Sequence, residues 1–522
     1  MKKTLLSALL LAALSAQAET VFRRDNGAEP KSIDPQIAQE TSGAAIIYDT
    51  FEGLVMHKMG GEIVPGVAEK WEMSDDGMTY TFHLRNNAKW SDGKPVTAQD
   101  FIYAWRRAVN PETASQFAYM LYPVKNAEKI AKGEEKDFEQ LGIKAIDDHT
   151  LEVTLESPTP YFMELMAHYT TYPTPKHVID KHGNKWTQPE TFVSNGPYVL
   201  SEHKPQAHMT LTKSPTYWNA DAVSIDKVIF YVIEDRNNAL SRYRSGEIDF
   251  VETVSNTQID WVRQNLADEL HIGPFLATYY YGFNLTKEPF KDNRDLRAAL
   301  SIALDRKTLT EKVTKTGEEP AYSVVPHSIE GAKPYTPEWV NKPREEQIKL
   351  AQELYAKAGY SKDKPLKVVL SYNTSEAHKN VAVAAAAMWK QVLGVETTLE
   401  NQEWKVLLSN IDEKKLQMFR LGWTGKYNDP NTFLDLFTQY SLNNHMGYVN
   451  PEYDRLIAEA GREQDKAKRA QIMHDAEAIF TEDYAMAPVY YYVNPILLKP
   501  HVKGYASFNM KKMPSQYLKI EK

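Results

Sequence analysis

The chain has 522 residues, of which 42% are hydrophobic and 25% are charged, and its formal net charge is −8. These values are typical of a large globular protein, exclude a largely disordered chain, and predict two or three domains. The acidic excess disfavours nucleic acid and an anionic membrane surface as partners. The absence of cysteine excludes disulfides, thiolate metal sites and a lipid-modified N-terminal cysteine.

The N-terminus is typical of a secretory signal peptide. Lys2 and Lys3 precede an apolar run at residues 5–14, and a small-x-small pattern ends at Ala18. This order predicts cleavage after Ala18, so that the mature chain begins at Glu19. A membrane anchor is the alternative, but the run is far shorter than the roughly 20 apolar residues that span a bilayer. We therefore expect a periplasmic protein without stable membrane insertion, and a monomer.

The remaining chain mixes strand-like and helix-like segments without a repeat. Runs rich in β-branched and aromatic residues predict strands at residues 79–84, 151–155, 227–232 and 366–372. Apolar residues at helical spacing predict helices at residues 98–108, 294–304, 344–358, 381–392 and 466–480. Proline-containing segments at residues 334–337 and 361–365 predict loops. The order of elements indicates an α/β or α+β chain of several domains.

Several motifs follow one another along the chain: Pro65-Gly66-Val67-Ala68-Glu69-Lys70-Trp71, Ala88 to Phe101, Asn195-Gly196-Pro197-Tyr198, Tyr217-Trp218, Arg242 to Asp249 and Pro289-Phe290-Lys291-Asp292. This series resembles the dipeptide/oligopeptide family of extracellular solute-binding proteins, which serve ABC transporters, and its oligopeptide-binding members in particular. The resemblance extends from about Asn26 to the C-terminus. Most of these residues have a structural interpretation, because Ser91-Asp92-Gly93 is typical of a tight turn and Trp90 of a buried packing residue.

The resemblance implies the fold and the role. The fold is the α/β periplasmic solute-binding protein fold, with two lobes joined by a hinge and an extra domain, three domains in all. Its layout places domain I at residues 19–51, 176–277 and 494–522, domain II at 52–175, and domain III at 278–493. The implied role is to capture oligopeptides between the lobes and to deliver them to an inner-membrane ABC permease.

The resemblance also implies a ligand-binding site. Two stretches, Gln39 to Thr41 and Arg420 to Lys426, would flank an extended peptide and pair with its backbone. Arg420 and His378 match family cations that hold a ligand carboxylate, although His378 has the alternative interpretation of a surface residue at a helix start. Each aromatic candidate has the alternative of lobe core. The full set is Gln39, Glu40, Thr41, Phe117, His378, Trp404, Arg420, Gly422, Trp423, Thr424, Gly425, Lys426 and Tyr492.

Lys426 departs from the family pattern, because the family usually has there an aspartate that pairs with the α-ammonium of the peptide. A second cation beside a buried ammonium costs several kcal/mol unless something compensates. Three explanations are open. Lys426 points outward or pairs with Asp429 or another acid while Glu40 supplies the negative charge; the ligand presents an anionic or acylated group, as a cell-wall or γ-linked peptide does; or the site is degenerate.

An enzyme is the hypothesis from a different class. The sequence contains no Gly-x-Ser-x-Gly, no His-Glu-x-x-His and no Gly-x-x-x-x-Gly-Lys-Ser/Thr motif. A periplasmic hydrolase is therefore disfavoured, and the enclosed site of the family disfavours a chaperone. We expect no cofactor and no metal.

Overall fold

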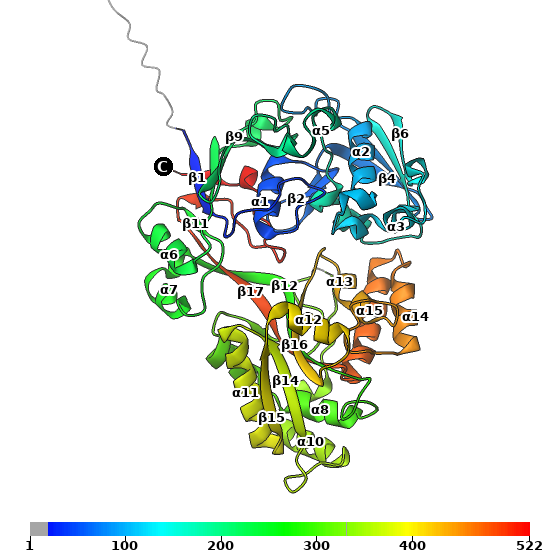
Figure 1. The fold of residues 1–522 in the computed structure, drawn as a ribbon, viewed down its shortest axis with the longest axis vertical. Helices are drawn as coiled ribbons and strands as arrows, with labels where there is room; N and C mark the ends of the chain where they lie inside the picture. The colour runs from blue at the N-terminus through cyan, green and yellow to red at the C-terminus, as the bar shows by residue number, and fades with distance from the viewer. Residues whose placement is uncertain (1–18, 330, 522) are drawn as a thin grey trace, which may run out of the picture.

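The computed structural model describes residues 19–329 and 331–521, so the predicted signal peptide lies outside the described residues. The fold is mixed α/β and has two halves, shown above and below one another in Figure 1. One eleven-stranded sheet extends through both halves. Its strands, in spatial order, are β15 (Glu396–Gln402), β14 (Lys367–Asn373), β16 (Met418–Thr424), β12 (Leu270–Phe283), β17 (Met486–Leu498), β11 (Phe250–Val251), β1 (Val21–Asp25), β10 (Lys227–Tyr231), β9 (His208–Lys213) and β8 (Tyr198–Lys204), with β13 (Glu319–Pro320) paired to β17.

The long strands β12 and β17 connect the two halves. They pair antiparallel along most of their length, with a register shift between Pro274 and Thr278. At one end β17 pairs with β11 of the upper half, and at the other end β12 pairs with β16 of the lower half (Figure 1). Residues 276–283 of β12 are buried throughout. Two extended segments that cross between lobes are the usual basis of hinge closure.

The upper half carries a separate four-stranded antiparallel sheet. Its order is β4 (Ala68–Met73), β5 (Thr79–Leu84), β7 (Thr150–Thr154) and β6 (Ile143–Asp147). Helix α2 (Ala98–Val109) begins with a capping box, in which Thr97 and Asp100 exchange side-chain and backbone hydrogen bonds. The short strands β2 (Val55–His57) and β3 (Ile63–Pro65) form a hairpin, and β18 (Val502–Lys503) pairs with β19 (Lys519–Ile520).

The predicted elements are confirmed, with one boundary that differs clearly. The predicted strands correspond to β5, β7, β10 and β14, and four predicted helices correspond to α2, α8 (Arg294–Ala303), α10 (Arg344–Lys357) and α15 (Lys466–Glu482). Helix α11 (Glu376–Leu393) starts five residues before the predicted position, because the Ser375 side chain caps it. The other α-helices are α1 (Thr41–Thr50), α3 (Ala127–Ala131), α4 (Phe162–Met166), α5 (Lys176–His182), α6 (Arg236–Arg244), α7 (Ile259–Asn265), α9 (Arg306–Thr308), α12 (Trp404–Asp412), α13 (Asn431–Leu434) and α14 (Pro451–Ala460).

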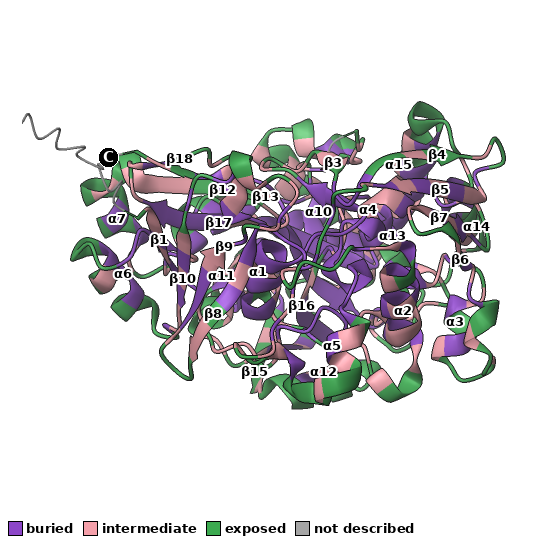
Figure 2. Cartoon of the chain, turned by 90° about the horizontal axis from the view of Figure 1, so that it is seen from above, coloured by how far each residue is buried: buried purple, intermediate pink, exposed green. Residues whose placement is uncertain are grey.

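Separate hydrophobic cores stabilise the two halves. One cluster joins residues between Phe22 and Phe250 with the C-terminal segment around Leu518, and includes Trp90 as predicted. Two other clusters lie in the lower half, between Leu276 and Tyr490. Figure 2 shows the buried residues gathered toward the middle of the molecule and the exposed residues around its outside. The upper core combines residues of predicted domains I and II, and the three-domain division stays a prediction.

Candidate functional site

Strand β16 carries the first half of the predicted site. It lies inside the sheet: Arg420 is opposite Tyr281 of β12, and the first two residues of β16, Met418 and Phe419, pair with β14. After Thr424 the chain leaves the sheet: the Gly425 amide donates to the Leu276 carbonyl (2.7 Å), and the Lys426 amide donates to the Thr432 hydroxyl (3.0 Å). The segment Arg420–Lys426 is thus held by backbone hydrogen bonds at both ends.

Arg420 is a buried cation without a carboxylate partner among the described residues. Its side chain is directed to Asn373 Oδ1 (3.1 Å) and to the hydroxyl of Tyr492 (2.6 Å), and its guanidinium lies 4.5 Å from the ring centre of Tyr279. The residue is only 6% exposed, and its Nε has no acceptor. A buried charge is costly unless it is paired, so this position fits an anionic ligand group.

His378 lies beside Arg420 in the first turn of α11. Its ring centre is 5.6 Å from that of Tyr279, and its Nδ1 is buried without a hydrogen-bond partner. Burial, and next the Arg420 charge, lower the pKa of His378 to about 3. The residue is therefore a neutral, half-buried imidazole rather than the surface residue considered as the alternative.

We expect His378 to stay neutral from pH 8 to pH 5 in the unliganded protein. Because its folded pKa lies below the unfolded value of 6.5, the unfolded chain takes up the proton first, and stability falls as the pH falls from 6.5 toward 3. NMR of histidine-labelled protein, with His378→Gln for assignment, checks this. In Arg420→Met protein the midpoint of the His378 titration should move up toward pH 6.5, because the Arg420 charge no longer lowers the pKa. A His378 midpoint near pH 6.5 in the wild type would contradict the expectation that His378 is buried and neutral.

The second half of the predicted site forms a cavity of about 150 Å³ to which both halves contribute. The structure brings six predicted residues together there: Gln39, Glu40, Thr41, Phe117, Gly425 and Lys426. The other lining residues include Arg24, Tyr48, His168, Tyr169 and the C-terminal segment Met510–Met513. Burial, followed by the neighbouring Lys512 and Lys426, keeps the pKa of His168 well below its usual range, so its imidazole adds no charge.

Lys426 has no carboxylate partner among the described residues. Its ammonium lies 5.9 Å from the ring centre of Trp423, and burial lowers its pKa. The suggested pair with Asp429 is wrong. Both oxygens of Asp429 accept from Arg469 (2.7 and 2.8 Å), because that guanidinium on α15 is buried beside them and offers two parallel donors.

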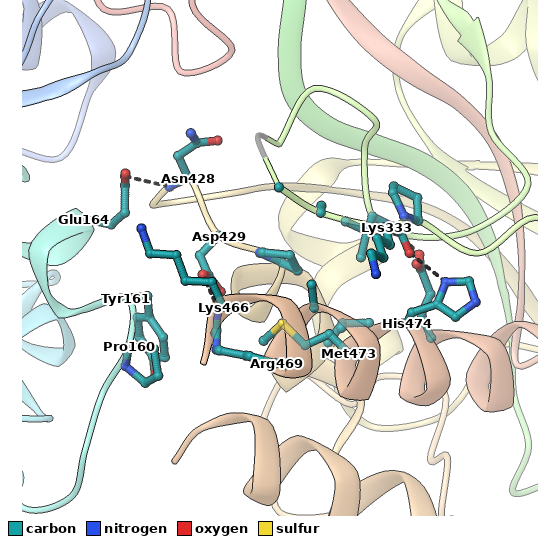
Figure 3. Close-up of a pocket in the computed structure, with 18 of the residues that line it drawn as sticks. Pro160, Tyr161, Glu164, Lys333, Asn428, Asp429, Lys466, Arg469, Met473 and His474 are labelled. Carbon is teal, nitrogen blue, oxygen red and sulfur yellow. Dashed lines mark hydrogen bonds and ion pairs between the residues drawn. The ribbon is translucent and has the colours of Figure 1, made fainter. Parts of the chain in front are cut away.

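The segment after Lys426 contacts the upper half directly. The rings of Tyr427 and Tyr161 stack with centres 5.1 Å apart, and the Asn428 amide donates to Glu164 (3.2 Å). Figure 3 shows this contact between Glu164 and Asn428, and Tyr161 beside Arg469, in the wall of a cavity of about 380 Å³. This larger cavity contains none of the predicted site residues. The lobe contact at this edge holds the backbone beside Lys426 in place.

The remaining predicted residues lie outside the cavity beside Lys426. Gly422 and Tyr492 adjoin Arg420, since a side chain at Gly422 would lie 3.6 Å from atoms of both Arg420 and Tyr492. Trp423 has a buried Nε1 without an acceptor, Thr424 is exposed, and Trp404 at the start of α12 is 42% exposed. Sequence reasoning missed site-lining residues that no motif marks, namely Arg24, His168, Tyr279, Asn373, Lys511 and Lys512.

The comparisons with known proteins define the class. The model of the bacterial extracellular solute-binding proteins, family 5, matches residues 62–444, so the chain belongs to this family of binding proteins. Among individual relatives, the periplasmic oligopeptide-binding protein OppA of Escherichia coli (strain K12) is 43% identical over 94% of this chain and 90% of its own length.

Two solved structures bear on the conformation. The unliganded open form of the periplasmic murein tripeptide-binding protein MppA has a TM-score of 0.87 at 38% identity, over 96% of this chain and 98% of that chain. The Haemophilus influenzae OppA complex with the peptide RPPGFSPFR has a TM-score of 0.78 at 38% identity, over 97% and 99%. The agreement is better with the open form than with the peptide complex.

Within the described residues, no cluster of three or more His, Asp or Glu side chains has the arrangement of a metal site. None of the helices in the same residues is both long and apolar enough to cross a membrane.

Proposed function

We propose that this protein is the periplasmic substrate-binding component of an ABC transporter, and that it captures peptides between its two halves and delivers them to an inner-membrane permease. The observation that carries the proposal is the buried, unpaired Arg420 on a strand beside the inter-lobe hinge of a solute-binding protein. A peptide carboxylate is the partner to which such a guanidinium donates two hydrogen bonds. Cleavage after Ala18 and release into the periplasm belong to the same proposal.

In this role, the segments Arg420–Lys426 and Gln39–Thr41 pair with the peptide backbone, which is common to all peptides. The aromatic residues Phe117, Trp404, Trp423 and Tyr492 provide side-chain contacts. Delivery requires that the closed state bind more tightly than the open state and that the permease favour the open one. The protein itself catalyses no reaction.

A second candidate keeps the same role for a ligand that lacks a free α-amine, such as a cell-wall peptide, a γ-linked peptide or another anionic solute. The unpaired Lys426 favours this candidate, because it leaves a cation where a peptide amine would otherwise lie.

Purified mature protein decides between the candidates. Mass spectrometry identifies any copurified ligand, and calorimetry measures the affinity for tri- to pentapeptides and for their N-acetylated forms. Tight binding of free-amino peptides regardless of sequence supports the first candidate and overturns the second. Binding of no peptide of either kind overturns the proposed role, and release of fragments from the same peptides by metal-free protein overturns the absence of catalysis.

A further inference from the structure

Two opposite charges without firm partners line the cavity beside Lys426. The Glu40 Oε2 atom is buried and has no hydrogen-bond donor, while its Oε1 atom lies 3.5 Å from Lys31, whose side chain is 84% exposed. Such an exposed pair contributes little. The Lys426 ammonium has no carboxylate within 4.0 Å in the described part of the chain, so Glu40 and Lys426 do not neutralise each other although both line one cavity.

The other cations around this cavity already have contacts. Arg24 donates to the Met513 carbonyl (3.1 Å), and Lys512 contacts His57 Nδ1 (2.7 Å) and donates to the Ala167 carbonyl (3.1 Å). The Lys511 ammonium lies 4.8 Å from the ring centre of Phe275. Lys511, like Lys426, has no carboxylate within 4.0 Å in the described part of the chain. Among the residues that line the cavity, Glu40 is the single carboxylate, and Lys426 is the cation that the lower half contributes.

A ligand with one charge satisfies only one of these groups. A peptide ammonium alone pairs with Glu40 and adds a cation beside Lys426, whereas an anion alone pairs with Lys426 and leaves the Glu40 carboxylate bare. Each arrangement leaves one partly buried charge without a partner, which is unfavourable. An ammonium and a carboxylate attached to the same carbon atom satisfy both. The cavity of about 150 Å³ holds a group of this size, since one water needs only about 15 Å³.

We propose that the cavity recognises the zwitterionic head of an α-amino acid, with Glu40 accepting from the ammonium and Lys426 donating to the carboxylate. A peptide keeps both groups at its amino end only when its first residue is linked through the side chain, as in γ-glutamyl and β-aspartyl peptides. The ligand class is then side-chain-linked peptides whose distant carboxylate pairs with Arg420. This inference rests on the proposed function and specifies its ligand.

Two isomers test it by calorimetry on the mature protein. γ-Glu-Ala-Ala and α-Glu-Ala-Ala have the same formula and the same number of charged groups, and they differ only in which carboxyl group of the glutamate is free: the α-carboxylate in the γ isomer and the side-chain carboxylate in the α isomer. We expect the γ isomer to bind at least about tenfold more tightly, as for the gain of one charged hydrogen bond. Glutaryl-Ala-Ala lacks the amine and 4-aminobutyryl-Ala-Ala lacks the α-carboxylate, and each should bind about tenfold more weakly than γ-Glu-Ala-Ala.

Two variants assign the roles. Glu40→Gln should remove the preference for γ-Glu-Ala-Ala over the glutaryl peptide and keep the preference over the 4-aminobutyryl peptide, and Lys426→Met should do the reverse. Lys31→Gln, at the exposed partner of Glu40, is the matched control and should change neither preference. Thermal unfolding confirms that each variant is folded.

The outcomes separate this inference from the proposed function. Equal affinity for the two isomers, or preferences that neither variant changes, overturns the zwitterion assignment while peptide binding itself stands. Failure of all four ligands and of ordinary tripeptides overturns both.

Discussion

Replacing Arg420 by methionine is expected to abolish the preference of the protein for a peptide acid over the corresponding peptide amide. In the wild type, the ligand carboxylate would pair with a guanidinium that is 6% exposed and has no carboxylate partner among the residues that the structure describes. Loss of one partner of such a desolvated pair costs about 2 to 5 kcal/mol, which raises the Kd at least about 30-fold. Calorimetry with the best-bound tripeptide and its C-terminal amide measures both quantities.

The same variant should remain folded. Arg420 has no carboxylate partner in residues 19–329 and 331–521, and methionine keeps most of its length, so the free energy of unfolding should change little. Arg455→Met on exposed α14, whose arginine pairs with Glu452 and Glu459, is the matched control and should leave affinity unchanged. If Arg420→Met still prefers the acid, the ligand carboxylate lies elsewhere.

Replacing the buried Arg469 by methionine should cause a large loss of stability. The change strands the Asp429 carboxylate, which is 8% exposed and receives two hydrogen bonds from Arg469. Removing one partner of a buried pair costs about 3 to 5 kcal/mol, and chemical denaturation followed by fluorescence measures it. The exposed pairs of Arg455 provide the contrast, since their loss in Arg455→Met should cost below about 1 kcal/mol.

A double variant completes this experiment. Asp429→Leu together with Arg469→Met replaces both charges by apolar groups, and such replacements are often neutral. The double variant should therefore be more stable than Arg469→Met alone. A single variant that unfolds with the wild-type midpoint would show that the pair contributes nothing to stability.

Local sequence patterns predicted the helices and strands in which apolar residues recur at a regular spacing. The strand at residues 79–84 and the helix at 98–108 have clear periodicity, and the structure has both. The crossing strands β12 and β17 were not predicted, because residues 276–283 are buried on both faces and show no alternation. Their partners lie far away in sequence, and pairing at that distance leaves no local pattern.

The site shows the same limit. Glu40 and Lys426 were named from a family resemblance, and the structure places both on one cavity. The contact between Arg420 and Asn373 joins residues 47 positions apart, which no spacing rule identifies. Asp429 was considered for Lys426 because it is near in sequence, yet Arg469 on α15 is its partner in space.

The stack of Tyr427 on Tyr161 joins the two halves near Lys426, so the two ends of the site, beside Lys426 and around Arg420, differ in how complete they are before a ligand binds. The cavity beside Lys426 already has walls from both halves, whereas the polar contacts of Arg420 all come from the lower half. Before a ligand binds, the cavity beside Lys426 is therefore already formed, whereas Arg420 still lacks contacts from the upper half. We therefore expect substitutions in the cavity beside Lys426 to change mainly the association rate, and substitutions around Arg420 to change mainly the dissociation rate.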